Sequence, residues 1–407
     1  MLTKVRVQNF KAIADSGEIA LDRLNAFIGR NGSGKSSTIE FLELLSNALE
    51  FDVRSASVPF RRGRDAIRGW RRENDTAVLS LTFDPGDVSA GDRVEYMLGL
   101  SAGEGGDSLE IASEALSVVF GDSKTEIIKT DDGVRVFRIP PTRQRGRVKG
   151  SRIRRPTAVG EREPGEWTRV DDRTTPALKF IDRSFSVGGY ALRTWLEAAT
   201  PLRLSPTAVA EFAPKRPTRG RKELDPLGLQ TAELLSTLTK DELSTILGKL
   251  RFVAGEFAQI ESHKPSGPGD QRYFLLTERV RGRRIEIPAW VLSEGTRRLT
   301  ALLAVLLRTR PAPLVMIEEV ENGFDPWTLK FVVEELVAAT ERGTQVVVTS
   351  HSPFLMNLLP REVFQFVSRS DDGARFSPIR GERGAARVLD AMGVGDAYAA
   401  NLLGRKR

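Results

Sequence analysis

The spacing of hydrophobic residues predicts a strand, a tight loop and a helix near the N-terminus. Residues 2–7 are expected to form a strand, and a second apolar stretch, "LNAFIG", occupies residues 24–29. In "SSTIEFLELLSNALE" (36–50), apolar residues recur at the spacing of a helix that buries one face. The glycine-containing segment between the strand and the helix is therefore expected to be a loop.

The pattern changes to period two between residues 76 and 139. Runs such as "TAVLSLTFD" and "DRVEYMLGL" alternate apolar and polar side chains, as half-buried strands do. Asp132 and Gly133 separate two such runs, and Asp-Gly is a preferred two-residue hairpin turn. An antiparallel β lobe is expected here.

Helical patterns return between residues 177 and 262, where they predict an inserted helical arm. A strand pair is expected in "RYFLLTERVRGRRIEIPAW" (272–290), and a long apolar helix follows it. Strand "LVMIEE" (314–319), a helix and strand "QVVVTS" (345–350) come next, and this alternation favours a parallel sheet. A last hairpin is expected at residues 363–379.

Composition removes several classes of chemistry. The chain has no cysteine, which excludes disulfides, thiolate metal sites and cysteine nucleophiles. Its two histidines, His263 and His351, argue against a polyhistidine metal centre. No apolar run is long enough to span a bilayer and the N-terminus lacks a signal-peptide stretch, so we expect a cytoplasmic protein without a membrane partner.

The loop at residues 29–36, "GRNGSGKS", fits the P-loop pattern G-x-x-x-x-G-K-[ST] in full. In such a loop, backbone N–H groups surround nucleotide phosphates, the lysine neutralises their oxygens and the last hydroxyl binds Mg²⁺. A Gly/Ser-rich surface turn is the alternative, but an apolar strand before the loop and an amphipathic helix after it disfavour that interpretation. The residues predicted to hold ATP are Gly29, Asn31, Gly32, Ser33, Gly34, Lys35, Ser36 and Ser37.

A second motif consists of the two acidic residues at the end of the run "PLVMIEE". A buried strand that ends in Glu318 and Glu319 supplies what a Mg²⁺–nucleotide site needs: one carboxylate for the metal and one for the attacking water. By position, Glu318 is predicted to hold Mg²⁺ together with Ser36, and Glu319 is predicted to be the catalytic base. An apolar run that ends in acidic residues is common by itself. Because the same chain has a P-loop, this run is expected to supply the second half of the nucleotide site.

Three further motifs are similar to those of ABC-type ATPases. Leu292–Thr296, "LSEGT", resembles their signature in its LS-x-G form, and residues 321–326, "ENGFDP", stand where the D-loop belongs. His351 in "VVVTSHSPF" stands where the switch histidine belongs. The resemblance implies that two copies enclose two ATP molecules, with Ser293 and Gly295 of one copy facing the nucleotide of the other. It also implies catalytic roles for Lys35, Glu319 and His351.

Within this class the chain most resembles the RecF, SMC and OLD branch. The motifs that carry this resemblance are "VRVQNFKAI", "IEEVENGFDP" and "TSHSPF". Walker B has Glu318 where most ABC heads have Asp, the D-loop reads Phe-Asp where Leu-His is usual, and no glutamine can be assigned to the Q-loop. Full OLD proteins carry a TOPRIM nuclease domain, and the sequence after His351 is too short for it. We therefore expect an OLD-like ATPase without that domain.

The expected fold is α/β: a P-loop head of ABC type, in which helices flank a mixed sheet, with an antiparallel β lobe and an inserted helical arm. The expected divisions are 1–139 for the N-terminal half of the head with the β lobe, 140–176 for a basic linker, 177–262 for the helical arm, 263–365 for the C-terminal half of the head, and 366–407 for a hairpin and basic tail.

Net charge is +7, and much of the basic charge lies in three segments, residues 61–72, 141–156 and 214–222. Such segments would bind DNA phosphates without sequence preference. Solvated loops of an arginine-rich protein are an equally good interpretation, so DNA remains one of two alternatives at this point.

The leading hypothesis is an ATPase that dimerises on ATP and acts as a switch or sensor in DNA metabolism or anti-phage defence. Its partners would be a second copy, or a larger homo-oligomer, and a separate effector such as a TOPRIM nuclease. The alternative is an ATP-binding scaffold with little turnover. A transporter subunit is disfavoured because the β lobe and the helical segment separate the P-loop from the signature.

Overall fold

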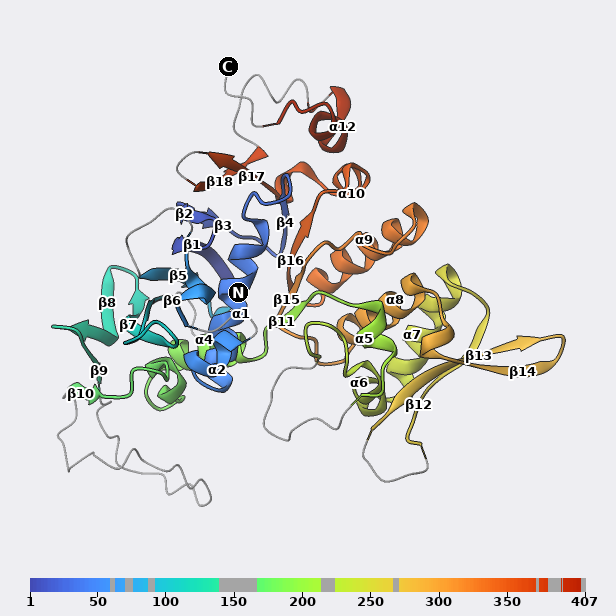
Figure 1. Ribbon diagram of the computed structural model, residues 1–407, viewed down its shortest axis with the longest axis horizontal. Helices are drawn as coiled ribbons and strands as arrows, with labels where there is room; N and C mark the ends of the chain where they lie inside the picture. The colour runs from blue at the N-terminus through green and yellow to red at the C-terminus, as the bar shows by residue number, and fades with distance from the viewer. Residues whose placement is uncertain are drawn as a thin grey trace. The chain divides into compact units, whose positions relative to one another are not determined.

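A computed structural model describes residues 1–58, 63–69, 76–86, 92–138, 167–213, 224–265, 271–370, 373–379, 389 and 391–403. The chain forms two compact units (Figure 1). Unit 1 comprises Met1–Ala20 and Leu44–Leu196, and unit 2 comprises Leu21–Glu43 and Glu197–Arg407. Helix α1 (Lys35–Glu50) runs from one unit into the other, so each unit is built from separated stretches of sequence.

Unit 1 contains a nine-stranded sheet with the order β10-β9-β8-β7-β6-β5-β1-β2, in which β3 also pairs with β1. Its paired strands are antiparallel, which confirms the expected β lobe. The turn between β8 and β9 is Asp132-Gly133, with φ angles of 46° and 72°, as a two-residue hairpin turn requires. The elements of unit 1 are β1 (Leu2–Phe10), β2 (Ile13–Asp15), β3 (Ile19–Ala20), α2 (Val53–Ser57), α3 (Gly63–Ile67), β5 (Ala77–Phe83), β6 (Asp92–Ala102), β7 (Leu109–Phe120), β8 (Ser123–Asp131), β9 (Val134–Arg138), β10 (Trp167–Val170), η3 (Ala177–Phe180) and α4 (Val187–Glu197).

Helix α4 covers β6 and β7 at close range, and two glycines make that approach possible. A Cβ on Gly188 would lie 2.8 Å from Val94 Cγ2, and one on Gly189 would lie 2.9 Å from Leu116 Cδ2. Both distances are shorter than van der Waals contact, so side chains there would push the helix away from the sheet. Strand β10 pairs with β9 and lies within residues 140–176, the range expected to be linker.

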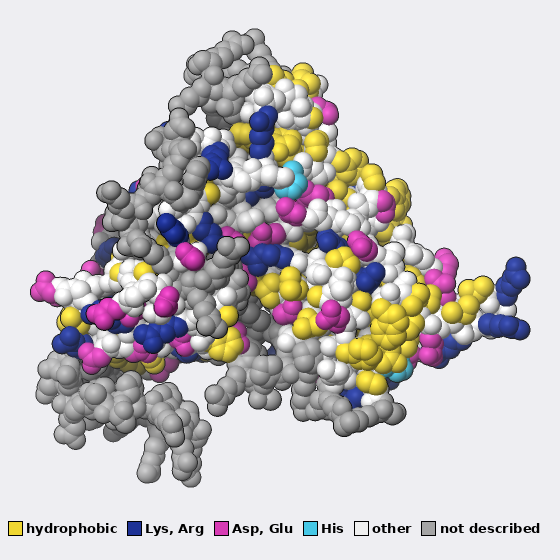
Figure 2. Space-filling view, in the orientation of Figure 1, with side chains coloured by type: hydrophobic (Ala, Val, Ile, Leu, Met, Phe, Trp, Pro, Cys, Tyr) yellow, Lys and Arg dark blue, Asp and Glu magenta, His cyan; other side chains and the backbone are white. Residues whose placement is uncertain are grey.

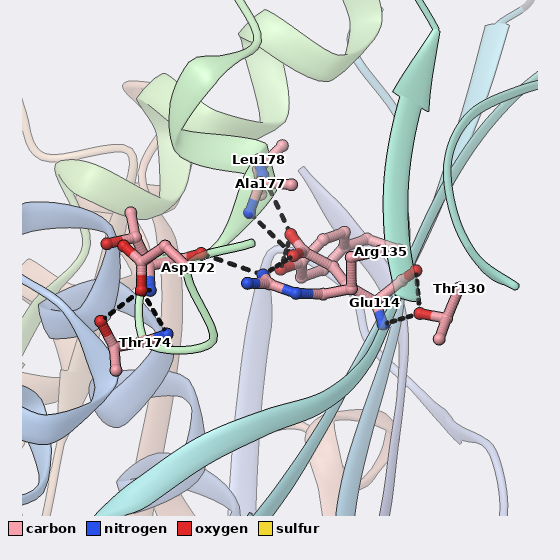
Figure 3. A network of polar contacts seen from close by, with 9 residues as sticks. Glu114, Thr130, Arg135, Asp172, Thr174, Ala177 and Leu178 are labelled. Atoms are coloured by element: carbon pink, nitrogen blue, oxygen red, sulfur yellow. Dashed lines mark hydrogen bonds and ion pairs between the residues drawn. The ribbon is translucent and has the colours of Figure 1, made fainter. Parts of the chain in front are cut away.

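A buried ion pair holds the start of η3 against the sheet of unit 1 (Figure 3). Glu114 of β7 and Arg135 of β9 are 2.9 Å apart, and their side chains are 0% and 3% exposed. The carboxylate of Glu114 also accepts hydrogen bonds from the Tyr96 hydroxyl at 3.0 Å and from the N–H groups of Ala177 and Leu178 at 2.7 and 2.9 Å. One carboxylate therefore joins three strands to the start of η3.

Unit 2 is organised around a six-stranded sheet with the order β11-β15-β16-β4-β17-β18 (Figure 1). The first five strands are parallel and only β18 is antiparallel, as the alternation of strands and helices predicts. A smaller antiparallel sheet, β12-β13-β14, contains the expected strand pair. The elements of unit 2 are β4 (Leu24–Ile28), β11 (Thr200–Leu202), α5 (Pro206–Ala210), α6 (Thr231–Thr237), α7 (Lys240–Val253), β12 (Phe257–His263), β13 (Tyr273–Val280), β14 (Arg283–Pro288), η4 (Ala289–Val291), α8 (Glu294–Leu306), β15 (Leu314–Ile317), α9 (Pro326–Glu341), β16 (Gln345–Ser350), α10 (Pro353–Leu358), η5 (Arg361–Val363), β17 (Phe364–Ser370), β18 (Gly373–Pro378) and α12 (Val394–Ala399).

The helices expected between residues 177 and 262 are present, and α5, α6 and α7 share one hydrophobic core with the six-stranded sheet. Strand β11 lies in the same stretch and pairs in parallel with β15, although no sequence pattern predicts it. Ser370 pairs with Gly373 in the β17–β18 hairpin, which confirms the last predicted hairpin.

Several sequence predictions fall on residues outside those described. These include the basic segments 141–156 and 214–222, the tail 404–407, and all of 61–72 except 63–69. Within the described part of the chain, no helix is long and apolar enough to cross a bilayer.

Replacing Glu114 with Gln should destabilise unit 1 by about 3–5 kcal/mol, because Arg135 would be left buried without a counter-charge. Native-state hydrogen exchange of amides in β7 and β9 measures this free energy. The matched control is Glu18→Gln, which breaks the exposed Lys4–Glu18 pair of the same unit and should leave protection unchanged. Equal protection in both variants would contradict the proposed role of the buried network.

Candidate functional site

The predicted P-loop connects β4 to α1, as expected. Gly29, Gly32 and Gly34 have φ angles of 155°, 72° and 106°, which residues with a Cβ rarely adopt. A Cβ on Gly29 would lie only 2.1 Å from the carbonyl oxygen of Val367 on β17, the strand that pairs with β4. Glycine is therefore needed here both for the bend and for the close approach of a neighbouring strand.

The loop surrounds the amine of Lys35. Lys35 Nζ donates to the carbonyl oxygens of Gly29 and Arg30 at 2.8 and 3.0 Å. Among the residues described, no carboxylate forms an ion pair with this buried amine. Burial lowers the pKa of Lys35, and the charges of Glu319 and Glu321 act in the opposite direction. A buried cation held only by carbonyls is suited to receive an anion.

The other P-loop residues divide into an inner and an outer group. Ser33 and Ser37 are buried, and Ser33 Oγ has no hydrogen-bond partner among the described residues. Asn31 and Gly32 are exposed at the outer side of the loop. An orphaned buried hydroxyl, bare backbone and the N-terminus of α1 together fit a phosphate chain.

Ser36 and Glu318 lie near each other. The Ser36 hydroxyl is close enough to influence the carboxylate of Glu318, which directly follows β15. Burial raises the pKa of Glu318, while Arg203 and the Ser36 hydroxyl partly offset that effect. A hydroxyl beside a carboxylate is a donor set that suits Mg²⁺, which takes few protein ligands and keeps several waters.

Glu319 and His351 also meet, at the ends of adjacent strands. His351 Nε2 lies 3.3 Å from Glu319 Oε1, and Asn322 Nδ2 donates to Glu319 Oε2 at 2.5 Å. The Thr349 hydroxyl accepts the Glu319 N–H at 2.9 Å, and Glu321 accepts the His351 N–H at 2.7 Å. His351 Nδ1 has no partner among the described residues.

The backbone of Glu319 is strained. Its φ angle is 49°, in the left-handed region that costs a residue with a Cβ about 1–2 kcal/mol. The bonds from Thr349 hold this conformation, since its hydroxyl and its carbonyl accept the N–H groups of Glu319 and Val320. In this conformation the Glu319 carboxylate lies beside His351, and such strain is typical of functional sites.

The signature residues lie at the start of α8, where Gly295 approaches the D-loop of the same chain. Ser293 is the N-cap, and its hydroxyl accepts the Thr296 N–H at 3.2 Å. A Cβ on Gly295 would lie 2.8 Å from the carbonyl oxygen of Gly323. Within the described residues, no hydrogen bond or ion pair joins Ser293 or Gly295 to the P-loop.

Sequence reasoning missed residues that reach the site from distant segments. Arg203, which follows β11, contacts Glu318, and Arg298 of α8 donates to the Asn322 carbonyl at 2.7 Å. At the loop rim, Arg30 donates to the Asn401 side chain at 3.1 Å, close to the end of α12. None of the sequence motifs described above includes Arg203 or Asn401.

Over residues 24–357, the sequence matches the protein family described as "AAA domain, putative AbiEii toxin, Type IV TA system". The chain belongs to this AAA-domain family. No curated protein sequence matches it.

Solved structures similar to this AAA-domain protein include SMC heads. One is the SMC head bound to the C-terminal winged-helix domain of ScpA, with 13% identity, a TM-score of 0.55, and coverage of 92% of this chain and 97% of that chain. Another is the SMC head with an extended coiled coil from Pyrococcus furiosus, bound to the C-terminal domain of ScpA, with 12% identity, a TM-score of 0.51, and coverage of 96% and 98%. The likeness establishes the fold, a P-loop head of the SMC and ABC type.

Glu319→Gly should be more stable than Glu319→Ala by about 1 kcal/mol, because glycine adopts the left-handed backbone without strain. Both variants lose the same carboxylate, so urea denaturation of unit 2 isolates the backbone term. At Lys330, an exposed position within α9, the order should reverse, with glycine less stable than alanine by about 0.5–1 kcal/mol. The same order at both positions would show that Glu319 is not strained.

Proposed function

We propose that the protein hydrolyses ATP with Mg²⁺ at the carboxyl edge of the six-stranded sheet. One observation carries this proposal: a buried, carbonyl-bound lysine, a hydroxyl–carboxylate pair and a strained glutamate facing a histidine all lie at that edge. Ligands of open α/β sheets bind outside the carboxyl ends of the strands. With the contacts they make within the protein, the loop lysine, Ser33 Oγ and His351 Nδ1 stay available to bind a ligand.

Each residue has a role that follows from its position. Lys35 and the loop N–H groups bind the phosphates, and Ser36 and Glu318 hold the cation. Bound Mg²⁺ would neutralise the β- and γ-phosphate oxygens. Glu319 Oε1 accepts the proton of the attacking water, Asn322 fixes the other carboxylate oxygen, and His351 is positioned to bond the γ-phosphate or that water.

The proposal extends to an ATP-dependent dimer. Gly295 lies close to the D-loop of its own chain, and neither Ser293 nor Gly295 forms a described bond to its P-loop. If the dimer resembles those of ABC-type ATPases, they face the nucleotide of a second copy, where the N–H groups at the start of α8 would meet the γ-phosphate. The stalled Glu319→Gln variant should therefore accumulate as a dimer with ATP.

Lys35→Ala should weaken ATP binding by about 10–100-fold, since it removes a charge-assisted contact to phosphate. Glu319→Gln should bind ATP but lower turnover by about 10²–10⁴-fold, because it cannot accept the proton. Phosphate release and mass measurement with and without ATP test both. Lys330→Ala, on the exposed side of α9, is the control, and wild-type turnover in Glu319→Gln would refute the assigned base.

We further propose that the protein senses nucleic acid, which binds at the β13–β14 hairpin. Arg279, Arg281, Arg283 and Arg284 are all exposed on this hairpin, and Figure 2 displays basic side chains at its tip. The register places Arg279 directly opposite Arg284, and like charges in that position repel each other. Only Arg284 has carboxylate partners among the described residues, so a polyanion would relieve the repulsion.

Replacing Arg279, Arg281 and Arg283 together with Gln should weaken binding to duplex DNA and reduce the salt slope by about 2–3, one phosphate contact for each arginine. The control triple variant is Arg93, Arg169 and Arg173 to Gln in unit 1, which removes equal charge from arginines already paired with carboxylates. Equal loss in both variants would mean that net charge, and not the hairpin, governs binding.

The biological role we propose is a cytoplasmic switch in DNA metabolism or anti-phage defence, in the manner of OLD-like ATPases. The family description supports this role because it refers to a toxin–antitoxin system. The similar SMC heads support it because each was solved with a bound domain of a partner protein. The effector would be a separate protein such as a TOPRIM nuclease. A scaffold that binds ATP without turnover is the alternative, and assembly that does not change between wild type and Glu319→Gln would favour it.

A further inference from the structure

Arg203 occupies an unusual place beside the proposed metal ligand. Strands β11 and β15 are parallel neighbours, and Leu202 pairs with Ile317. The next residue of each strand is therefore at the same edge, which brings Arg203 next to Glu318. The Glu318 N–H donates to the Leu202 carbonyl at 2.9 Å, and the Arg203 N–H donates to Pro226 at 2.6 Å. The backbone of both residues is thus fixed.

The guanidinium of Arg203 contacts two carboxylates with different nitrogens. Its Nε lies 2.5 Å from Glu318 Oε1, and its Nη2 lies 2.7 Å from Glu43 Oε2. Glu43 belongs to α1, two turns after Ser36, and its side chain is only 3% exposed. Because the two contacts use separate sides of one planar fork, rotation of the guanidinium away from Glu318 would break both.

The carboxylate of Glu43 holds the Arg203 side chain in place. Glu43 has no role in the proposed hydrolysis, and a buried carboxylate without a counter-charge is costly. Its pairing with Arg203 anchors the guanidinium from the side of α1. The anchored guanidinium then faces one oxygen of Glu318 at 2.5 Å, while the Ser36 hydroxyl lies near the same carboxylate. Glu318 is thereby fixed between the arginine and the P-loop serine.

We propose that Arg203 is a positioning residue: anchored by Glu43, it holds the Glu318 carboxylate in place beside Ser36, and so sets how strongly Mg²⁺ enhances nucleotide binding. This inference rests on the proposed nucleotide site. Arg203 acts through Glu318 and touches neither phosphate nor cation. It differs from Lys35, which acts on the phosphates directly and whose loss weakens binding with or without metal.

The chemistry of the side chain makes arginine specific here. A lysine carries the same charge as a single point and cannot present two fixed donors to two carboxylates. Lysine at position 203 should therefore restore part of the effect, and an uncharged side chain should restore none. Outer-shell partners of metal ligands typically change metal affinity by about 10–100-fold when mutated.

The test is the ratio of nucleotide dissociation constants in EDTA and in Mg²⁺, measured with a fluorescent ATP analogue. Arg203→Met should reduce this ratio by about 10–100-fold and leave the constant in EDTA within about twofold of wild type. Arg203→Lys should give an intermediate ratio. Lys249→Met, which breaks a partly buried ion pair with Glu335 elsewhere in unit 2, should keep the wild-type ratio.

The outcomes separate this inference from the proposed function. If wild type binds no nucleotide in either condition, the nucleotide site itself is refuted. If wild type gains affinity from Mg²⁺ and Arg203→Met gains as much, the inference alone is overturned. An equal loss in EDTA and in Mg²⁺ overturns it as well, since that pattern marks a structural role. Thermal unfolding of each variant verifies that unit 2 remains folded.

Discussion

The parallel pairing of β11, β15, β16 and β4 is the constraint on which the candidate site depends. In that register, Val315 pairs with Val346 and Val348 pairs with Ala26, so the four strands end at one edge of the sheet. The next residues along the chain are Arg203, Glu318, His351 and Gly29. Four segments separated by long stretches of sequence therefore meet at this edge, and the chemistry follows from the sheet.

At this edge, the folded chain keeps energetically unfavourable features that the binding of a ligand would offset. The amine of Lys35 is buried among carbonyls, Ser33 Oγ is orphaned, and the backbone of Glu319 is strained. Each feature is unfavourable for stability alone, and such features gather at functional sites. By contrast, the buried carboxylate of Glu114 in unit 1 has its hydrogen bonds supplied by Arg135, by Tyr96 and by neighbouring backbone, as a structural carboxylate should.

Local patterns in the sequence predicted the elements that carry the main groups. The strand–loop–helix around Lys35, the Asp132-Gly133 hairpin and the acidic end of β15 each depend on residues close in sequence, and all are found. Arg203 could not be predicted, because β11 is a three-residue strand with no periodicity and its pairing with β15 is a long-range event. Asn401 was missed for the same reason: only the tertiary fold brings it to Arg30.

Hydrogen–deuterium exchange of the full-length protein, with and without ATP and Mg²⁺, tests the central claim most directly. If the carboxyl edge of the six-stranded sheet is the nucleotide site, peptides covering residues 29–38, 317–322 and 349–352 gain protection together on addition of ATP and Mg²⁺. Saturating ATP and Mg²⁺ that leave all three peptides unchanged, or protect only segments of unit 1, would contradict the account.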